Sequence, residues 1–156
     1  MRRRDGFTLI ELTIVVAIAG IVVAFGALTF SGYFQRSAAR RAAQVFAQDL
    51  VVARSYAVRA QEPVVLRVFE GTLWYQIVTR NTDTEVVRRR FTGSSAEIDL
   101  SSVALDVSGD TLVFNSRGQI DMSGAASALG TAAFSAGEVT YEVQFNSLGA
   151  SKVEES

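Results

Sequence analysis

The feature that most constrains this chain is a long uncharged run from Leu12 to Phe34, preceded by the basic tripeptide Arg2–Arg4. A helix rises about 1.5 Å per residue, so this run is long enough to cross a hydrocarbon core of about 30 Å. Arginines next to such a run favour a cytoplasmic position for that end of the chain. The sequence therefore predicts one membrane-crossing helix with a cytoplasmic N-terminus and a body on the far side.

Glu11, at the start of the apolar segment, distinguishes three interpretations of it. A cleaved signal peptide has an apolar region of only about 7–15 residues, shorter than this one. A plain anchor fits the length, but a carboxylate costs about 2.5–3.5 kcal/mol at mid-helix and less near the end. A leader cut between Gly6 and Phe7 gives Glu11 a partner, because the new Phe7 amine lies one helical turn away or can pair with Glu11 of a neighbour. Taken alone, Glu11 could also snorkel to the membrane interface.

The string from Gly6 to Leu12, Gly-Phe-Thr-Leu-Ile-Glu-Leu, resembles the class III signal of type IV pilins and type II secretion pseudopilins. The resemblance implies cleavage after Gly6 by a prepilin peptidase and methylation of the Phe7 amine. It also implies that Glu11 helps to recruit and register the subunit in a helical filament. One departure is Leu28, which stands where many members of these families carry a proline.

Beyond the membrane segment, from Gln35, the composition changes to Ala, Arg and Gln while apolar residues recur at helical spacing. We expect one nearly continuous helix from about Phe7 to Ala60, ended by Pro63 because the residue before a proline disfavours helix. The expected buried face consists of Ala39, Ala43, Phe46, Leu50, Ala53 and Ala57.

After Pro63 the apolar period drops to two, which predicts an antiparallel meander over residues 64–92. Within its third strand, Arg88 and Arg90 should point one way and Arg89 the other. The three arginines then cannot form one flat nucleic-acid patch, and a charged edge strand is expected instead. The expected strands of the meander are Val64–Phe69, Leu73–Thr79 and Glu85–Thr92.

The rest of the body is expected to alternate short strands with turns and one mobile loop rich in Ala, Ser and Gly. In chain order these are strands at Ile98–Leu100, Val103–Val107 and Thr111–Phe114, a turn at Asn115–Gly118, the loop Ser123–Gly137, a strand at Glu138–Phe145 and brief pairing at Ala150–Val153.

The stretches Leu50–Arg59, Pro63–Leu66 and Leu112–Gly118 resemble the GspH/FimT family of minor pilins and pseudopilins. The resemblance implies an α+β fold, in which a long N-terminal helix, half transmembrane and half amphipathic, packs on a C-terminal antiparallel β-sheet domain. FimT-type members linked to DNA uptake carry basic residues after their last glycine. Here Gly149 is followed by one basic residue, Lys152, and then by two acids, so those binding residues do not carry over.

These features divide the chain into four parts. They are a cleaved leader at 1–6, a transmembrane or filament-core helix at 7–34, an amphipathic helix half at 35–61 and a β-rich globular domain at 62–156.

Catalysis is not expected from this sequence. The chain contains neither histidine nor cysteine, which removes the commonest general base, the commonest metal ligand and any thiol chemistry. It also lacks a Gly-x-Ser-x-Gly elbow and a phosphate-binding P-loop. The acid pairs Glu97/Asp99 and Asp106/Asp110 are interpreted as solvated turn residues rather than as catalytic or calcium-binding groups. We therefore expect no enzyme activity, no cofactor and no metal.

The function predicted is that of a structural minor subunit of a type IV pilus-like filament, with a type II secretion pseudopilin favoured. The alternatives are a FimT-like minor type IV pilin that contributes to DNA binding or uptake, and a membrane-tethered extracytoplasmic domain that never polymerises. Expected partners are other pilin or pseudopilin subunits, the prepilin peptidase, the inner-membrane assembly platform and membrane lipid, with nucleic acid less favoured. The expected location is the inner membrane, single-pass with a periplasmic body, and then the pilus or pseudopilus.

Overall fold

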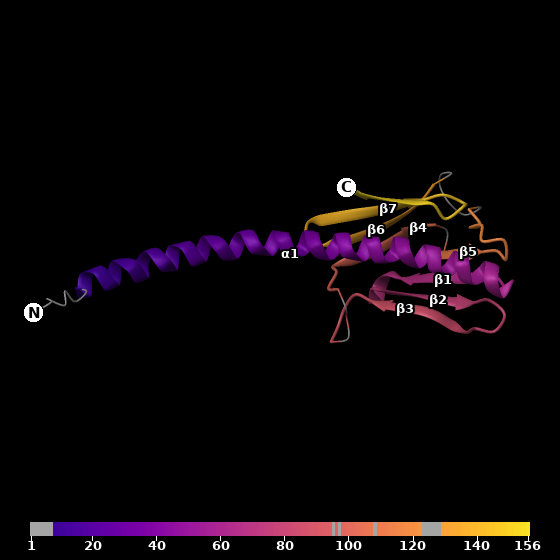
Figure 1. Cartoon of the computed structure of the whole chain (residues 1–156), viewed down its shortest axis with the longest axis horizontal. Coiled ribbons are helices and arrows are strands. Elements are labelled where there is room, and N and C mark those ends of the chain that lie inside the picture. Colours follow the sequence, from indigo (N-terminus) through magenta and orange to yellow (C-terminus); the bar gives the residue numbers. More distant parts are fainter. Residues whose placement is uncertain (1–7, 95, 97, 108, 123–128) are drawn as a thin grey trace, which may run out of the picture. The chain divides into compact units, whose positions relative to one another are not determined.

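The computed structural model of the chain describes residues 8–94, 96, 98–107, 109–122 and 129–156, apart from the side chains of residues 25–31. The chain forms two compact units, Met1–Phe34 and Gln35–Ser156. One helix, α1 (Leu9–Ala60), contributes to both units (Figure 1). The prediction of one helix that continues to Ala60 is therefore confirmed.

In the N-terminal unit, α1 presents its apolar side chains to the surroundings. Every large apolar side chain that the structure describes from Leu9 to Val23 is at least 53% exposed. No helix within the described residues is both long enough and apolar enough to cross a membrane.

In the second unit, α1 buries one face against two β-sheets. The six residues predicted for this face, from Ala39 to Ala57, all have no exposed surface, and Ala42 joins them. Most of these residues are alanines, so small side chains make up much of the buried face of α1. The helix ends where Gln61 adopts a left-handed conformation (φ 53°), just before Pro63.

The strands form two four-stranded sheets in which all described pairs are antiparallel. The first sheet has the order β3-β2-β1-β5, so the predicted meander is confirmed and β5 returns to pair with the free edge of β1. The second sheet has the order β4-β6-β7-β8. The strand bounds are β1 (Val64–Phe69), β2 (Trp74–Thr79), β3 (Glu85–Arg90), β4 (Ser102–Asp106), β5 (Thr111–Phe114), β6 (Gly130–Ala136), β7 (Val139–Phe145) and β8 (Ser151–Glu155), with a short 3₁₀ helix, η1 (Glu70–Thr72), between β1 and β2.

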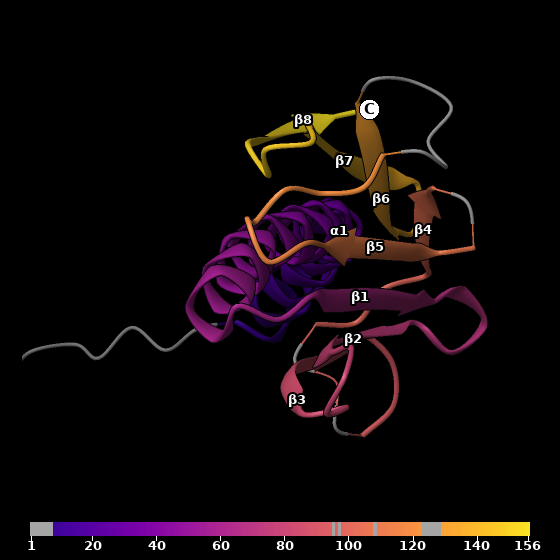
Figure 2. The same cartoon turned by 90° about the vertical axis from the view of Figure 1, so that its right-hand side faces the viewer.

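Phe46 on α1 joins the two sheets into one core. Its ring centroid lies 5.4 Å from that of Tyr75 in β2, 5.2 Å from that of Phe134 in β6 and 6.4 Å from that of Phe145 in β7. Figure 2 looks nearly along α1 and shows the strands of both sheets beside it. The structure confirms the predicted α+β fold, a long helix packed on antiparallel sheets.

The expectation of a mobile loop over Ser123–Gly137 is wrong for its second half, because β6 is an inner strand of the second sheet. Ala132, Phe134 and Ala136 are buried while the residues between them are half-exposed. Small side chains hid this alternation in the sequence. Residues 123–128 lie outside the described part of the chain.

Three smaller expectations also need correction. Ile98–Leu100 forms no strand, although Leu100 is buried in the core. The strand expected at Val103–Val107 begins and ends one residue earlier. The C-terminal segment pairs along its whole length from Ser151 to Glu155 with β7, rather than briefly. The acidic C-terminal segment is therefore a strand of the second sheet. Its sequence gave only a weak strand signal, because Val153 is the single apolar residue among polar and charged ones.

A buried polar network ties α1 to the first sheet. Asp49 on α1 is only 3% exposed, and its carboxylate accepts hydrogen bonds from the Tyr75 hydroxyl (2.7 Å) and from two nitrogens of Arg89 (2.9 and 3.2 Å). Burial, together with the adjacent Asp49 carboxylate, raises the pKa of the Tyr75 hydroxyl, so it stays protonated and donates. Arg89 thus points inward while Arg88 and Arg90 are exposed, as predicted for the edge strand β3.

Candidate functional site

Glu11, the predicted assembly residue, lies in the first turn of α1 and takes part in capping its N-terminus. Its carboxylate Oε2 accepts hydrogen bonds from the Thr8 backbone N–H (2.9 Å) and the Thr8 hydroxyl (2.8 Å). The Thr8 hydroxyl oxygen in turn accepts from the Glu11 N–H (3.3 Å). This reciprocal arrangement is a capping box, and the helix dipole at this end also favours a carboxylate.

The capping box is a role for Glu11 that the sequence interpretation missed. Its signal, a threonine three residues before a glutamate at the start of an apolar helix, is present in the sequence. The predicted cleavage and methylation residues, Gly6 and Phe7, lie outside the described residues. The structure places the Glu11 carboxylate at the first turn of α1, against Thr8.

A second candidate feature is a pair of matching turns in the β domain. Phe114 and Phe145 each begin a Phe-Asn-Ser-x-Gly sequence, and the two glycines that end them, Gly118 and Gly149, adopt positive φ angles of 76° and 74°. In each turn the asparagine side-chain oxygen accepts hydrogen bonds from two backbone N–H groups. The donors are Arg117 and Gln119 in the first turn (2.9 and 3.0 Å). In the second turn they are Leu148 and Ala150 (3.0 and 3.1 Å). The sequence predicts a turn at both copies, Asn115–Gly118 and Asn146–Gly149, but the family resemblance rests on the Phe-x-x-x-Gly pattern of the first copy.

Arg54 on α1 connects these two turns. Its guanidinium donates a 2.7 Å hydrogen bond to the Leu148 carbonyl oxygen in the second turn. Its aliphatic stem lies against Gly118 in the first turn, where a Cβ atom would come within 2.8 Å of the Arg54 Cγ. The turns also contact each other, since the Ile120 N–H donates to the Ser147 carbonyl (2.7 Å). The helix end and the Phe-x-x-x-Gly turn, which carried the family resemblance, therefore meet at one end of the β domain.

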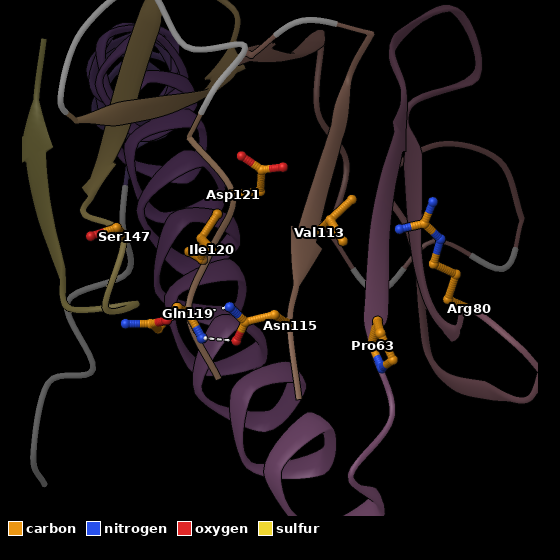
Figure 3. Close-up of a pocket in the computed structure, with 8 residues that line it drawn as sticks. All are labelled: Pro63, Arg80, Val113, Asn115, Gln119, Ile120, Asp121 and Ser147. Atoms are coloured by element: carbon orange, nitrogen blue, oxygen red, sulfur yellow. Dashed lines mark hydrogen bonds between the residues drawn. The ribbon is translucent and has the colours of Figure 1, made fainter. Parts of the chain in front are cut away.

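A depression of about 440 Å³ lies beside the first turn (Figure 3). Asn115 and Gln119 line it and are hydrogen-bonded to each other (3.0 and 3.3 Å). Its lining brings together amide, hydroxyl and oppositely charged side chains from the residue that follows β2, from the segment that follows β5 and from the second turn. These groups can form hydrogen bonds. The residues are Pro63, Arg80, Val113, Asn115, Gln119, Ile120, Asp121 and Ser147.

The turn glycine Gly118 gives a testable prediction. Gly118→Ala should lower the free energy of unfolding by about 1–3 kcal/mol, because it combines a positive φ with steric overlap against Arg54 and Val58. Gly93→Ala is the matched control, since Gly93 has a φ of 89° but open space around it, and should cost about 1 kcal/mol. Denaturant unfolding of the purified protein measures both. Equal losses would show that the contact with Arg54 is not tight.

Two family models match this chain. The model described as type II transport protein GspH matches residues 42–151, which include the end of α1 and both turns. The chain belongs to the GspH family. A model of the prokaryotic N-terminal methylation motif matches residues 1–27, which include Gly6, Phe7 and Glu11. Among curated protein sequences, none matches the chain.

Solved structures share the fold of this GspH-family protein. The type IV minor pilin FimU of Pseudomonas aeruginosa has a TM-score of 0.56 at 15% identity, and the match covers 78% of this chain and 92% of FimU. The minor pseudopilin EpsH of the Vibrio cholerae type 2 secretion system has a TM-score of 0.50 at 14% identity, with coverage of 76% and 97%. Together with the two family models, this fold shows that the chain is a minor pilin- or pseudopilin-type structural subunit, as the sequence predicted.

Proposed function

We propose that this protein is a minor subunit of a type II secretion pseudopilus and takes part in protein secretion. The observation that carries the proposal is the match of residues 42–151 to the type II transport protein GspH, in a chain that also starts with the methylation motif. The family and the fold are those of structural subunits, so we propose a role in assembly and no catalysis.

The proposed assembly begins in the inner membrane. The helix over residues 7–34 holds the subunit there with its N-terminus in the cytoplasm, while the helix half 35–61 and the β domain 62–156 lie in the periplasm. A prepilin peptidase removes residues 1–6 and the Phe7 amine is methylated. The subunit then moves into a filament, where the apolar side chains exposed from Leu9 to Val23 pack against helices of neighbouring subunits and no longer need lipid.

Glu11 has a defined part in this proposal. Thr8 holds its carboxylate at the first turn of α1, where the carboxylate can form an ion pair with the Phe7 ammonium group of a neighbouring subunit. Glu11→Ala should leave cleavage after Gly6 normal but reduce incorporation into sheared filaments by about tenfold or more, since an unpaired ammonium in an apolar bundle costs several kcal/mol. Mass spectrometry of the mature N-terminus and quantification of the sheared fraction measure the two effects.

Thr8→Ala is the matched control for the capping role. It removes both hydrogen bonds of the Thr8 hydroxyl but keeps the Glu11 carboxylate and the backbone N–H of residue 8 that donates to it, so it should weaken the helix start by about 1 kcal/mol and still assemble. Equal loss of assembly in both variants would assign Glu11 to capping alone. Normal incorporation of Glu11→Ala would remove Glu11 from the proposed mechanism, and an intact Met1 in the mature protein would overturn the processing step.

The alternative is a minor type IV pilin that contributes to DNA binding or uptake, favoured by the fold likeness to FimU. The C-terminal segment counts against DNA binding, because Lys152 is ion-paired with Glu154 and the Glu155 carboxylate pairs with Arg36 (3.4 Å). Deletion of the gene separates the two functions. Loss of type II cargo from the culture medium supports the pseudopilus, whereas loss of surface pili or DNA uptake with normal secretion supports the pilus.

A further inference from the structure

In the described part of the chain the two sheets end in four edge strands, and three of these edges are interrupted or covered. The ladder between β2 and β3 contains a register shift. The backbone N–H of Leu105 in β4 donates to the Glu70 carboxylate (3.2 Å). The Val113 carbonyl in β5 accepts a hydrogen bond from the Asp121 N–H (2.9 Å). Such features keep an edge strand from pairing with another chain.

The fourth edge strand, β8, is regular and open. It pairs with β7 without a register shift and contains no proline. The Asn146 N–H donates to the Ala150 carbonyl (3.1 Å), so the even-numbered positions of β8 bond to β7. Bonded positions alternate along an antiparallel pair, so the backbone groups at the odd-numbered positions point away from β7. These positions are Ser151, Val153 and Glu155, which we call the open edge.

The helix α1 lies alongside β8. Arg54 donates to the Leu148 carbonyl in the turn before β8 (2.7 Å), and Arg36 pairs with Glu155 at the end of β8 (3.4 Å). These two contacts lie at opposite ends of the segment from Leu148 to Glu155, so both ends of this segment are fixed to the helix. A chain that paired with the open edge would therefore also lie next to α1.

Beside these two arginines, α1 carries side chains that the β domain leaves uncovered. Arg40 and Val51 each lie about one helical turn from Arg36 and Arg54, and Ala47 lies between them at helical spacing. Val51 is 58% exposed and Ala47 is partly buried. Arg40 is exposed and has no ion pair with any residue that the structure describes. We call Arg40, Ala47 and Val51 the α1 stripe.

The open edge and the α1 stripe together define the chemistry of a partner. Backbone groups that recur at every second residue are matched by another extended chain. Side chains of that chain that point toward α1 meet Ala47 and Val51, which favours apolar residues there. An acidic side chain opposite Arg40 supplies its counter-charge. Arg40 and Val51 are separated by about 16 Å of helix, which an extended chain spans in about five residues.

We propose that an extended segment of a different filament subunit adds to the open edge as a further strand of the second sheet. Apolar residues of this segment cover Val51, and an acidic residue pairs with Arg40. The partner has another sequence, because a minor subunit is outnumbered in a filament by the other subunits. This inference rests on the proposed function, which places the chain in such a filament.

A proline in β8 tests the strand addition directly. Val153→Pro removes one N–H of the open edge and places a ring there, while the hydrogen bonds to β7 come from the neighbouring positions. Val153→Ala is the matched control, because it also truncates this partly buried side chain but keeps the N–H. Both changes are made in the full-length chain. Hydrogen exchange of the β7 amides shows whether the ladder to β8 is intact in each variant.

Photo-crosslinking identifies the partner. A photo-reactive phenylalanine replaces Ser151 in one strain and Val51 in another, and cells with the complete set of filament subunits are irradiated before the filaments are sheared. We expect both positions to form adducts with one other subunit, within about ten residues of each other in its sequence. Val153→Pro should reduce the adduct from position 51 about tenfold or more, whereas Val153→Ala should leave it unchanged.

Charge reversal at Arg40 supplies a second comparison that does not alter β8. Arg40→Glu should reduce the adduct from position 51 about tenfold or more, because two acids then face each other. Reversal of the acidic residue in the crosslinked segment of the partner should restore the adduct. Arg59→Glu, at an exposed arginine outside the α1 stripe, makes the same change in net charge and should leave the yield unchanged.

Each contrary outcome has its own meaning. Filaments that contain the chain but give no adducts overturn the strand addition and leave the proposed function standing. Adducts that persist in both Val153→Pro and Arg40→Glu do the same. Adducts with a second copy of this chain or with a secreted protein overturn the partner that we propose. Absence of the chain from sheared filaments counts against the proposed function itself.

Discussion

Replacing Asp49 with alanine should lower the free energy of unfolding by about 3 kcal/mol, the lower part of the range for breaking a buried ion pair. The Asp49 carboxylate is buried and accepts hydrogen bonds from Tyr75 and Arg89. Its removal leaves the buried Tyr75 hydroxyl without this acceptor and takes the Asp49 carboxylate away from the Arg89 guanidinium. The Arg89 side chain is 31% exposed, so water can hydrogen-bond to its guanidinium and compensate part of the loss. Unfolding of the full-length protein in detergent, followed by fluorescence of the single tryptophan Trp74, measures the change.

Two further variants separate the parts of this network. Tyr75→Phe removes one hydrogen bond while the ring still packs, so we expect a loss of about 1 kcal/mol. Arg90→Ala is the matched control on the same strand, since Arg90 is exposed, and should change the stability by no more than about 0.5 kcal/mol. If Asp49→Ala costs no more than Arg90→Ala, the network does not hold α1 against the first sheet.

The sequence was sufficient to predict the elements whose apolar residues follow one clear period. The alanines and Phe46 on α1 recur at helical spacing, and the meander from Val64 alternates bulky apolar residues with polar ones, so both were predicted correctly. The Asp49–Arg89 pair could not be predicted in this way, because the two residues are 40 positions apart and only the packing of α1 on β3 brings them together. The direction of Arg89 was predictable, but its partner was not.

The strand β6 was missed because the signal of burial is weak in small residues. Ala132 and Ala136 are buried but small, and the serine and glycine residues around them are typical of turns. The glycine at position 130 is explained by tertiary packing, since a Cβ atom there would overlap the ring of Phe145 on the neighbouring strand. The two Phe-Asn-Ser-x-Gly turns were available in the sequence as a repeat, whereas the hydrogen bond from Arg54 to Leu148 depends on the fold.

Phe46→Ala should have an effect at least as large, a loss of about 3–5 kcal/mol in the free energy of unfolding. The Phe46 side chain has no exposed surface and packs on Tyr75 of the first sheet and on Phe134 and Phe145 of the second. Truncation leaves a cavity between α1 and the two sheets. The helix cannot move in to fill this cavity, because buried alanines on either side of Phe46 already pack in the core. Denaturant unfolding measures the loss.

The same variant tests whether the two sheets unfold together. Trp74 fluorescence reports on the first sheet, and hydrogen exchange of the β6 and β7 amides reports on the second. If Phe46 joins the sheets, Phe46→Ala should lower the free energy of unfolding by the same amount in both measurements. Phe46→Leu should lower it less, because leucine fills more of the cavity. Gln48→Ala, at an exposed position on the same helix, is the control and should cost no more than about 0.5 kcal/mol. Loss of protection in one sheet only would mean that each sheet packs on α1 separately, and that Phe46 stabilises a single helix–sheet contact.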